Sequence, residues 1–256
     1  MARWGAIPRG QRVYAIGDVH GCYDLLVDLI RRIREDDAAR AEAQTTIVFL
    51  GDLIDRGPAS AQVVTHLMRW TERSDRVVVL KGNHEEMMAD ALGGDLEVLQ
   101  AWLGFGGRET LLSWGLAADL LDGGDLVGIL EAATQAIDPA VRRWVDRLPS
   151  SAHIGGWLFV HAGVRPGLTL ARQHEQDMLW IGEEFLSSKL RHPWRVMHGH
   201  TVVEDGPDLR PNRIGLDTGA YRTGRLSAAG LEDEDVWFLV TEGRTELTLR
   251  SEVDPG

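Results

Sequence analysis

The sequence predicts an α/β fold in which a mixed β-sandwich is flanked by helices. In the first part of the chain, an apolar strand-like run, a polar glycine loop and a helical pattern follow one another three times. A helical stretch comes next, and the remainder is rich in short strand-like runs separated by turns. The 256 residues, of which 44% are hydrophobic, can form such a sandwich as a single domain.

The first five elements alternate between strands and helices. Residues 13–16, 46–50 and 76–80 are short apolar runs that favour strands. In residues 23–34 and 60–70, apolar side chains recur every three or four positions, which predicts amphipathic helices that pack on a sheet. Strands joined by such helices run parallel to one another.

A helical insertion is expected at about residues 86–148. Apolar side chains at helical spacing, interrupted by the glycines at 93–94 and 104–107, predict two short helices, and residues 126–145 predict two more. The insertion either overhangs a site at the strand ends or only covers a face of the sheet.

The rest of the chain predicts further strands. Residues 157–160 and 195–197 are strand-like, with a helical stretch at 177–190 between them, and residues 232–235 form a hairpin turn. The strand-like runs of the tail, which predict antiparallel hairpins, are 214–216, 226–231, 236–241 and 247–250.

Polar side chains stand at the ends of the predicted strands. Asp18, Asp52 and Asn83 lie 34 and 31 residues apart, about one β-α-β unit, so parallel strands would bring them to one edge of one sheet. Asp18 and His20 are two residues apart, which in extended backbone points both side chains to the same side. The candidate metal ligands at strand ends are Asp18, His20, Asp52, Asn83, His161 and His200.

This set of donors suits two divalent cations. Oxygen and nitrogen donors without a thiolate favour ions such as Mn, Fe or Zn over a tetrahedral structural zinc. Ions in such pairs lie roughly 3.5–4 Å apart and share a ligand, and the middle carboxylate, Asp52, is the natural bridge. The pair would polarise a phosphoryl oxygen and acidify a water toward hydroxide for in-line attack on phosphorus.

Three neighbouring residues suit the other steps of such a reaction. His84 is a candidate general acid, and Asp55 could orient it and raise its pKa. Arg56 offers a planar fork for phosphate oxygens. Each also has a plain structural interpretation, with Asp55 and Arg56 as a loop salt bridge and His84 as a side chain at a helix start.

The same segments resemble a known family. Residues 17–21 (GDVHG), 51–57 (GDLIDRG) and 82–85 (GNHE) resemble signatures of the phosphoprotein phosphatase branch of the calcineurin-like metallophosphoesterases, and 161–163 (HAG) and 200–206 (HTVVEDG) resemble its later signatures. The resemblance implies a four-layer α-β-β-α fold and selects His200, rather than the neighbouring His198, as a ligand.

The resemblance also implies roles for individual residues. It makes His84 the proton donor and Asp55 its partner, with Arg56 and Asn83 at the phosphate. The nearest relatives are bacterial and phage phosphoserine and phosphothreonine phosphatases and the diadenosine tetraphosphatases, and residues 102–115 resemble their lid segment.

One position departs from that pattern. Such relatives usually carry a second phosphate-binding arginine just after a Trp-Ile pair, whereas here Trp180 and Ile181 are followed by Gly182. Either Arg191, Arg195 or another basic residue substitutes for it, or phosphate is held more weakly.

The composition excludes some other classes. A formal net charge of -12 and a pI near 5.2 argue against a protein that coats nucleic acid. Cys22 is the only cysteine, so the chain has no internal disulfide. Without a secretory signal or an apolar run of about 18 residues, we expect a cytoplasmic protein that does not act at a membrane.

Three functions therefore compete. The leading one is a two-metal phosphomonoesterase that acts on phosphoserine and phosphothreonine in proteins, with Mn as the expected metal and Fe, Zn or Mg as alternatives. The second is hydrolysis of dinucleoside polyphosphates at the same site. The third is a phospho-binding scaffold without catalysis, to which Gly182 gives slight support. The partner is then a phosphoprotein or a phosphorylated small molecule, and the sequence does not indicate the oligomeric state.

Overall fold

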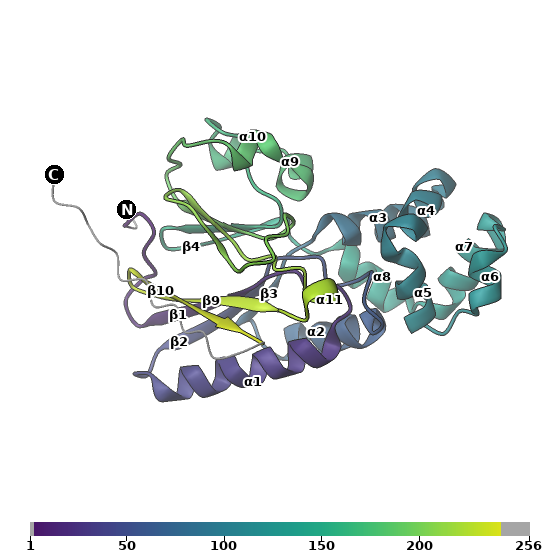
Figure 1. The fold of residues 1–256 in the computed structure, drawn as a ribbon, viewed down its shortest axis with the longest axis horizontal. Coiled ribbons are helices and arrows are strands. Elements are labelled where there is room, and N and C mark those ends of the chain that lie inside the picture. Colours follow the sequence, from purple (N-terminus) through teal and green to yellow (C-terminus); the bar gives the residue numbers. More distant parts are fainter. Residues whose placement is uncertain (1–2, 242–256) are drawn as a thin grey trace.

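Two mixed β-sheets pack face to face and carry helices on their outer faces. The computed structural model describes residues 3–241, and the strand expected at 247–250 lies outside them. Figure 1 shows the two sheets as neighbouring layers, with α1 and α2 beneath one of them and α9 and α10 above the other. The predicted fold class is therefore confirmed.

The first sheet has the strand order β10-β9-β1-β2-β3. The strands β1, β2 and β3 are parallel, as the β-α-β spacing predicted, whereas β9 runs antiparallel to β1 and forms a hairpin with β10. The strands are β1 (Gln11–Ile16), β2 (Gln44–Phe49), β3 (Val77–Val79), β9 (Ser227–Glu232) and β10 (Asp235–Val240).

The second sheet has the order β4-β5-β6-β8-β7. Its three central strands are parallel, and an antiparallel strand lies on each edge. The strands are β4 (Ser151–Ile154), β5 (Trp157–Val160), β6 (Arg195–His198), β7 (Asp208–Leu209) and β8 (Arg213–Gly215). The expectation that the strand at 214–216 belongs only to antiparallel hairpins is wrong, because β8 lies between β6, to which it is parallel, and β7.

The side chains of β1 alternate between two cores. Val13 and Ala15 face the second sheet, where they join the apolar cluster that fills the sandwich. Tyr14 and Ile16 face the other way and join the larger cluster under the helices. All four side chains are buried. A shift of β1 by one residue would therefore move the side chains of each core into the other one.

Short helices and turns cover the outer faces of the sheets. The helix expected at 23–34 extends to Ala39, and the stretch expected at 177–190 is two short helices that pack on the second sheet. The helices are α1 (Tyr23–Ala39), α2 (Ser60–Arg73), the 3-10 turn η2 (Leu170–Arg172), α9 (Glu175–Trp180), α10 (Glu183–Leu186) and α11 (Ala220–Thr223).

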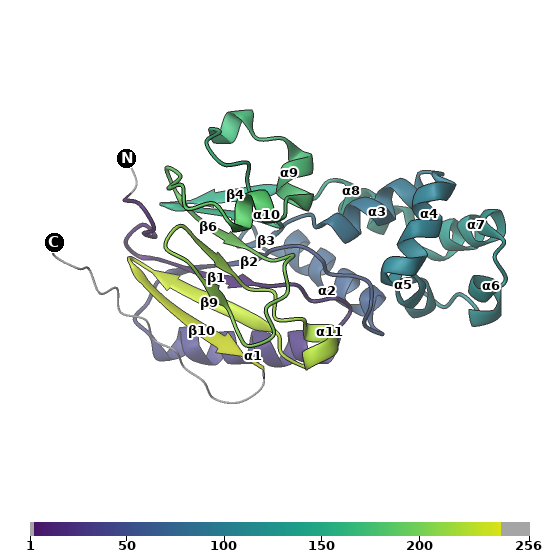
Figure 2. The same cartoon turned by 45° about the horizontal axis from the view of Figure 1, so that its top comes forward.

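The segment between β3 and β4 is helical and lies to one side of the sandwich (Figure 2). The glycines at 104–107 interrupt the helical backbone as expected, because Gly106 has a non-helical φ of 115° and the chain kinks there. The helices are α3 (Asn83–Leu92), α4 (Leu96–Trp102), η1 (Leu103–Gly107), α5 (Arg108–Ser113), α6 (Ala118–Asp122), α7 (Leu126–Ala136) and α8 (Pro139–Asp146). No helix within residues 3–241 has both the length and the apolar character needed to span a bilayer.

A buried arginine ties the first sheet to its helix. Arg12 in β1 is 1% exposed, and its guanidinium donates to Asp37 Oδ1 at 2.7 Å, to Glu232 Oε2 at 2.9 Å and to the carbonyl of Ala41 at 2.7 Å. These contacts join the end of α1 to β1 and β9. A buried charge is costly unless it is paired, so these contacts compensate the burial of the Arg12 guanidinium.

We expect Arg12→Met to lower the free energy of unfolding by about 1–3 kcal/mol, because a charge-assisted network is lost while the two carboxylates keep partial hydration. Urea unfolding measures the difference. The matched control is Arg31→Met, whose exposed pairs with Asp28 and Glu35 are worth about 1 kcal/mol at most. Equal losses in the two variants would contradict the assignment.

Candidate metal centre

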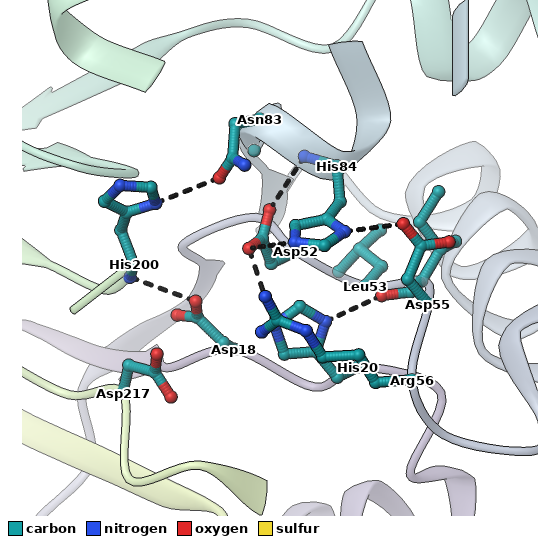
Figure 3. A network of polar contacts seen from close by, with 12 residues as sticks. Asp18, His20, Asp52, Leu53, Asp55, Arg56, Asn83, His84, His200 and Asp217 are labelled. Carbon is teal, nitrogen blue, oxygen red and sulfur yellow. Dashed lines mark hydrogen bonds and ion pairs between the residues drawn. The ribbon is translucent and has the colours of Figure 1, made fainter. Parts of the chain in front are cut away.

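The structure brings all six proposed ligands to the carboxyl ends of the parallel strands. Asp18 and His20 follow β1, Asp52 follows β2, and Asn83 begins α3 just beyond β3. His161 and His200 come from the second sheet, directly after β5 and two residues after β6. Figure 3 shows side chains from both sheets converging around Asp52. The expected meeting at one edge is therefore present in the fold, and it draws on both sheets.

Asp52 stands at the middle of the cluster. Its Oδ1 lies 3.3 Å from His161 Nε2, and its Oδ2 lies 3.5 Å from His20 Nε2 and 3.8 Å from His84 Nε2. Two groups of donors, His20 with His84 and His161 with His200, each have ligand atoms that lie with those of Asp52 within 4.8 Å of one another. The two oxygens of one carboxylate thus face different imidazoles, as those of a bridging ligand would.

Backbone contacts orient two of the imidazoles. His20 Nδ1 lies 2.8 Å from the carbonyl of Ile54, and His161 Nδ1 lies 2.9 Å from the carbonyl of Leu50. Each Nδ1 therefore carries the proton and leaves an Nε2 lone pair aimed at the centre. Hydrogen bonds of this kind fix metal-ligating histidines in other proteins.

The donors around Asn83 have more lone pairs than protons. Asn83 Oδ1 lies 2.8 Å from His161 Nε2 and 2.9 Å from His200 Nδ1. Because His161 also faces a carbonyl through Nδ1, a neutral ring cannot donate to both neighbours. Burial lowers the pKa of His161, which opposes a second proton. The chemistry of these donors therefore fits a cation between them.

Two buried carboxylates lack partners for one oxygen each. Asp18 and Asp217 are each 2% exposed, and Asp18 Oδ1 and Asp217 Oδ2 make no hydrogen bond to the described residues. Burial and mutual repulsion raise the pKa of Asp18, and burial raises the pKa of Asp217 to about 6. A bound cation would compensate the charge of both carboxylates. Gly199 leaves room beside Asp18, because a Cβ at this position would lie 2.0 Å from Asp18 Oδ1.

Asp217 is not among the residues expected from the sequence. It is the second residue after β8, the same relation that Asp18 has to β1, and its strand is parallel to β6. The strand-end pattern that identified Asp18 could therefore have identified it. The short β8 was expected to lie in an antiparallel hairpin, and that expectation hid the relation.

The electrostatics of the cluster favour a bound cation. Burial alone would raise the pKa of Asp52, but His161, His84 and His20 outweigh it and hold that pKa below its ordinary value. Burial lowers the pKa of His20 to about 3 and that of His200 to about 4. At neutral pH the centre therefore combines an ionised carboxylate with neutral imidazoles, which are the protonation states that metal ligands require.

His84 and Asp55 form a tight pair beside the cluster. His84 Nδ1 lies 2.5 Å from Asp55 Oδ2, and Asp55 is fully buried. Burial alone would lower the pKa of His84, but the carboxylates of Asp52 and Asp55 outweigh it and raise that pKa. The raised pKa favours the protonated imidazole, and Nε2 faces the cluster.

Two residues from the helical segment hold Asp55 in place, and the sequence pattern does not indicate this. Trp102 Nε1 donates to Asp55 Oδ2 at 2.8 Å, and Thr110 Oγ1 donates to Asp55 Oδ1 at 2.6 Å. Both come from the segment that resembles a lid. Because they are 47 and 55 residues from Asp55, no local pattern could assign them to it.

Glu85 locks two loops of the cluster together. Its carboxylate is fully buried and accepts the backbone N–H groups of Asp52, Leu53 and Gly82, each at 2.8 Å. Burial and the charge of Asp52 raise its pKa to about 7. The loop after β2 is thus tied to the start of α3 through one side chain.

Several proposed site residues have backbone conformations that are unfavourable for residues other than glycine. Six non-glycine residues among those described have positive φ, and Asp233 in a hairpin turn is the one outside this region. The others have φ values between 44° and 73°: His20, Asp52, Asp55, Arg56 and His200. Such conformations cost on the order of 1 kcal/mol or more each, and they persist where the surroundings determine them.

Arg56 reaches into the cluster, but a second arginine is not found at the expected place. Arg56 Nη1 lies 2.7 Å from His20 Nε2. A side chain at Gly182 would have open space, since a Cβ there would meet nothing within 4 Å. Arg191 stacks on a tryptophan ring at 4.0 Å, and Arg195 donates to a backbone carbonyl and lies over another tryptophan. Both guanidinium groups make other contacts in this structure, and a substitute role for either one stays a prediction.

His198 points away from the centre. It is 1% exposed, its ring lies against Phe185, and its Nε2 lies 3.1 Å from Arg213 Nη1. These contacts belong to the outer layer of the second sheet, which agrees with the choice of His200 as the ligand.

Comparison with known proteins agrees with the fold and the residue pattern. The calcineurin-like phosphoesterase family matches residues 11–226. Serine/threonine-protein phosphatase 1 of Salmonella typhimurium is 29% identical over 238 residues, which are 87% of this chain and 93% of that protein. A symmetrical bis(5'-nucleosyl)-tetraphosphatase of Xanthomonas oryzae is 30% identical over 210 residues, 80% of this chain but 54% of that protein.

A solved structure shares the fold at lower identity. The cold-active protein-tyrosine phosphatase of a psychrophilic Shewanella superposes with a TM-score of 0.57 and 20% sequence identity, covering 96% of this chain and 84% of that one.

We expect Glu85→Gln to lower the free energy of unfolding by about 1–3 kcal/mol, because an amide NH₂ must then face at least one backbone N–H that has lost its acceptor. Chemical denaturation of metal-free protein measures it. Glu131→Gln, an exposed change in α7, is the matched control and should leave stability unchanged. A Glu85 variant as stable as this control would show that the carboxylate does not hold the loops.

Proposed function

The chain belongs to the calcineurin-like phosphoesterase family, and on that premise we propose that it is a two-metal phosphomonoesterase acting on phosphoserine and phosphothreonine in proteins. The observation that carries the proposal is the position of Asp52, whose two oxygens face different groups of imidazoles. Proteins of this family use a centre of two divalent metal ions, and the donors at this site fit such a pair.

We assign the metal ligands as Asp18, His20, Asp52, Asn83, His161 and His200, with Asp52 as the bridge. When bound, two divalent cations would polarise the phosphoryl oxygens and acidify the attacking water. We propose Mn as the first choice. Fe, Zn and Mg are alternatives, because nitrogen and oxygen donors without thiolates accept all four metals.

His84 is the proposed proton donor to the leaving oxygen. Its Nδ1 is held by Asp55, its raised pKa keeps the proton available, and its Nε2 faces the cluster. Arg56 and Asn83 are the proposed phosphate contacts, since the guanidinium fork of one and the amide of the other adjoin the ligands. The helical segment at 86–148 is, in this proposal, an insertion within one domain that supplies Trp102 and Thr110 to the donor's partner.

Protein substrates are favoured over dinucleotides by extent and identity taken together. The Salmonella phosphatase aligns over nearly its whole length at 29% identity. An asymmetrical tetraphosphatase of Anoxybacillus flavithermus also aligns over most of its length but is 25% identical, and the chain spans about half the length of the Xanthomonas tetraphosphatase. The slightly higher identity of the Xanthomonas tetraphosphatase keeps hydrolysis of dinucleoside polyphosphates as a second candidate. The donors grouped around Asp52 and the contact between His84 and Asp55 support a catalytic function over a scaffold.

A screen of metal-free protein tests the substrate and the metal together. Mn, Mg, Zn or Fe is added back, and turnover of a phosphoserine peptide, a phosphotyrosine peptide and diadenosine tetraphosphate is compared. We expect Mn with the phosphoserine peptide to give the highest kcat/KM. Faster turnover of diadenosine tetraphosphate would overturn the protein substrate, and no turnover with any metal would favour the scaffold.

The role of His84 is tested by His84→Asn. We expect kcat to fall by roughly 10²–10⁴, the usual worth of a general acid, while the bound metal is retained. Steady-state kinetics and elemental analysis give the two readouts. The control is His153→Asn, an exposed histidine in β4 that should leave both unchanged. Full activity in the His84 variant would remove this residue from the mechanism.

A further inference from the structure

A concave surface lies between α1 and α2, on the outer face of the first sheet. It is a groove of about 600 Å³, within the range of small-molecule sites. Both helices lie on the side of the sheet that faces away from the second sheet (Figure 1). The aromatic and charged residues among those that line it are Tyr23, Arg34, His66, Arg69, Trp70 and Arg73.

The groove presents three unpaired cations. Arg34, Arg69 and Arg73 are exposed, and none of them makes an ion pair or a hydrogen bond with the described residues. None of the described residues that line the groove is Asp or Glu. In a chain with a net charge of -12, this surface is locally positive.

The carboxylates that α1 offers nearby are already engaged. Asp28 binds Arg31 and Arg32, and Glu35 binds Arg31. Arg34, on the same helix, is therefore left for a ligand from outside.

Aromatic rings form the floor between the arginines. The ring centroids of Tyr23 and His66 lie 5.7 Å apart, and those of His66 and Trp70 lie 5.9 Å apart. A hydrogen-bond contact of 3.1 Å between the Tyr23 hydroxyl and His66 Nδ1 joins the two helices. Trp70 packs against buried Phe49, and the Arg34 guanidinium lies 5.9 Å over the Trp70 ring. A flat ring and a cationic fork are thus held together.

Helical spacing places these groups in one row. On α2, His66, Arg69 and Arg73 are separated by three and four residues, so they share one face of the helix. At 1.5 Å per residue this row spans roughly 10 Å, and Trp70 adjoins it. An occupant would meet an aromatic surface at one part of the groove and two guanidinium groups one turn further along.

We propose that this groove binds a nucleoside phosphate, with its base stacked on Trp70 and His66 and its phosphates held by Arg69, Arg73 and Arg34. A base requires an aromatic face, and phosphate oxygens match the planar donor fork of arginine. The site is separate from the metal centre, which lies at the strand ends, and it does not rest on the proposed function. An acidic peptide could use the arginines but not the ring surface.

The test is calorimetric titration of the metal-loaded protein with α,β-methylene-ADP, a non-hydrolysable analogue. We expect Arg69→Ala/Arg73→Ala to weaken binding at least tenfold, since two charge-assisted contacts are lost. Arg9→Ala is the control, because Arg9 is another exposed arginine without a partner among the described residues and lies outside the groove. Its affinity should equal that of the unmodified protein.

Further titrations measure the contributions of the nucleoside and of the phosphates to binding, and they distinguish the groove from the metal centre. Adenosine and pyrophosphate should each bind more weakly than α,β-methylene-ADP, because each makes only part of the contacts. Binding that persists in Arg69→Ala/Arg73→Ala but is lost in Arg56→Ala would place the ligand at the metal centre and overturn the proposal. Absence of binding at millimolar concentration, or a polyglutamate peptide that binds as tightly, would overturn it too.

Discussion

A single desolvated carboxylate organises the functional end of this molecule. Asp52 is 2% exposed, lies between imidazoles from both sheets, and keeps its charge although burial opposes it. An ionised group in such a place must be compensated by hydrogen bonds and positive charge. The loop contacts of Glu85, the fixed tautomers of two histidines and the positive φ values nearby all serve to hold this charge and its neighbours in place.

Much of this arrangement could be predicted from the sequence, because β-α-β repeats have a regular length. Asp18, Asp52 and Asn83 follow three consecutive strands, so the parallel pairing of β1, β2 and β3 brings them together without further information. The histidines of the second sheet, His161 and His200, were predicted from their positions after strand-like runs and from the motifs at 161–163 and 200–206. These predictions succeed because each depends on the end of one strand and the direction of its neighbour.

The rest could not be predicted, because it depends on contacts between distant segments. Nothing local in the sequence indicates that Trp102 and Thr110 would bind Asp55, or that Arg191 and Arg195 would lie over tryptophan rings. The strands β4 and β7 were missed because they are short and only partly buried, so they lack an apolar run. Net charge misleads in a similar way, since an acidic total hides a groove with three free arginines.

The attachment of Asp55 to the helical segment constrains how this part of the molecule can diverge. Trp102 and Thr110 stand on either side of the kink at Gly106, and both donate to the same carboxylate. Helices further along the segment can change in length or sequence without touching that carboxylate. A homologue that replaced the whole segment would have to supply two new donors from its own sequence. We therefore expect the stretch from Trp102 to Thr110 to evolve with Asp55, and the helices beyond it to vary mainly at positions outside the buried apolar cluster.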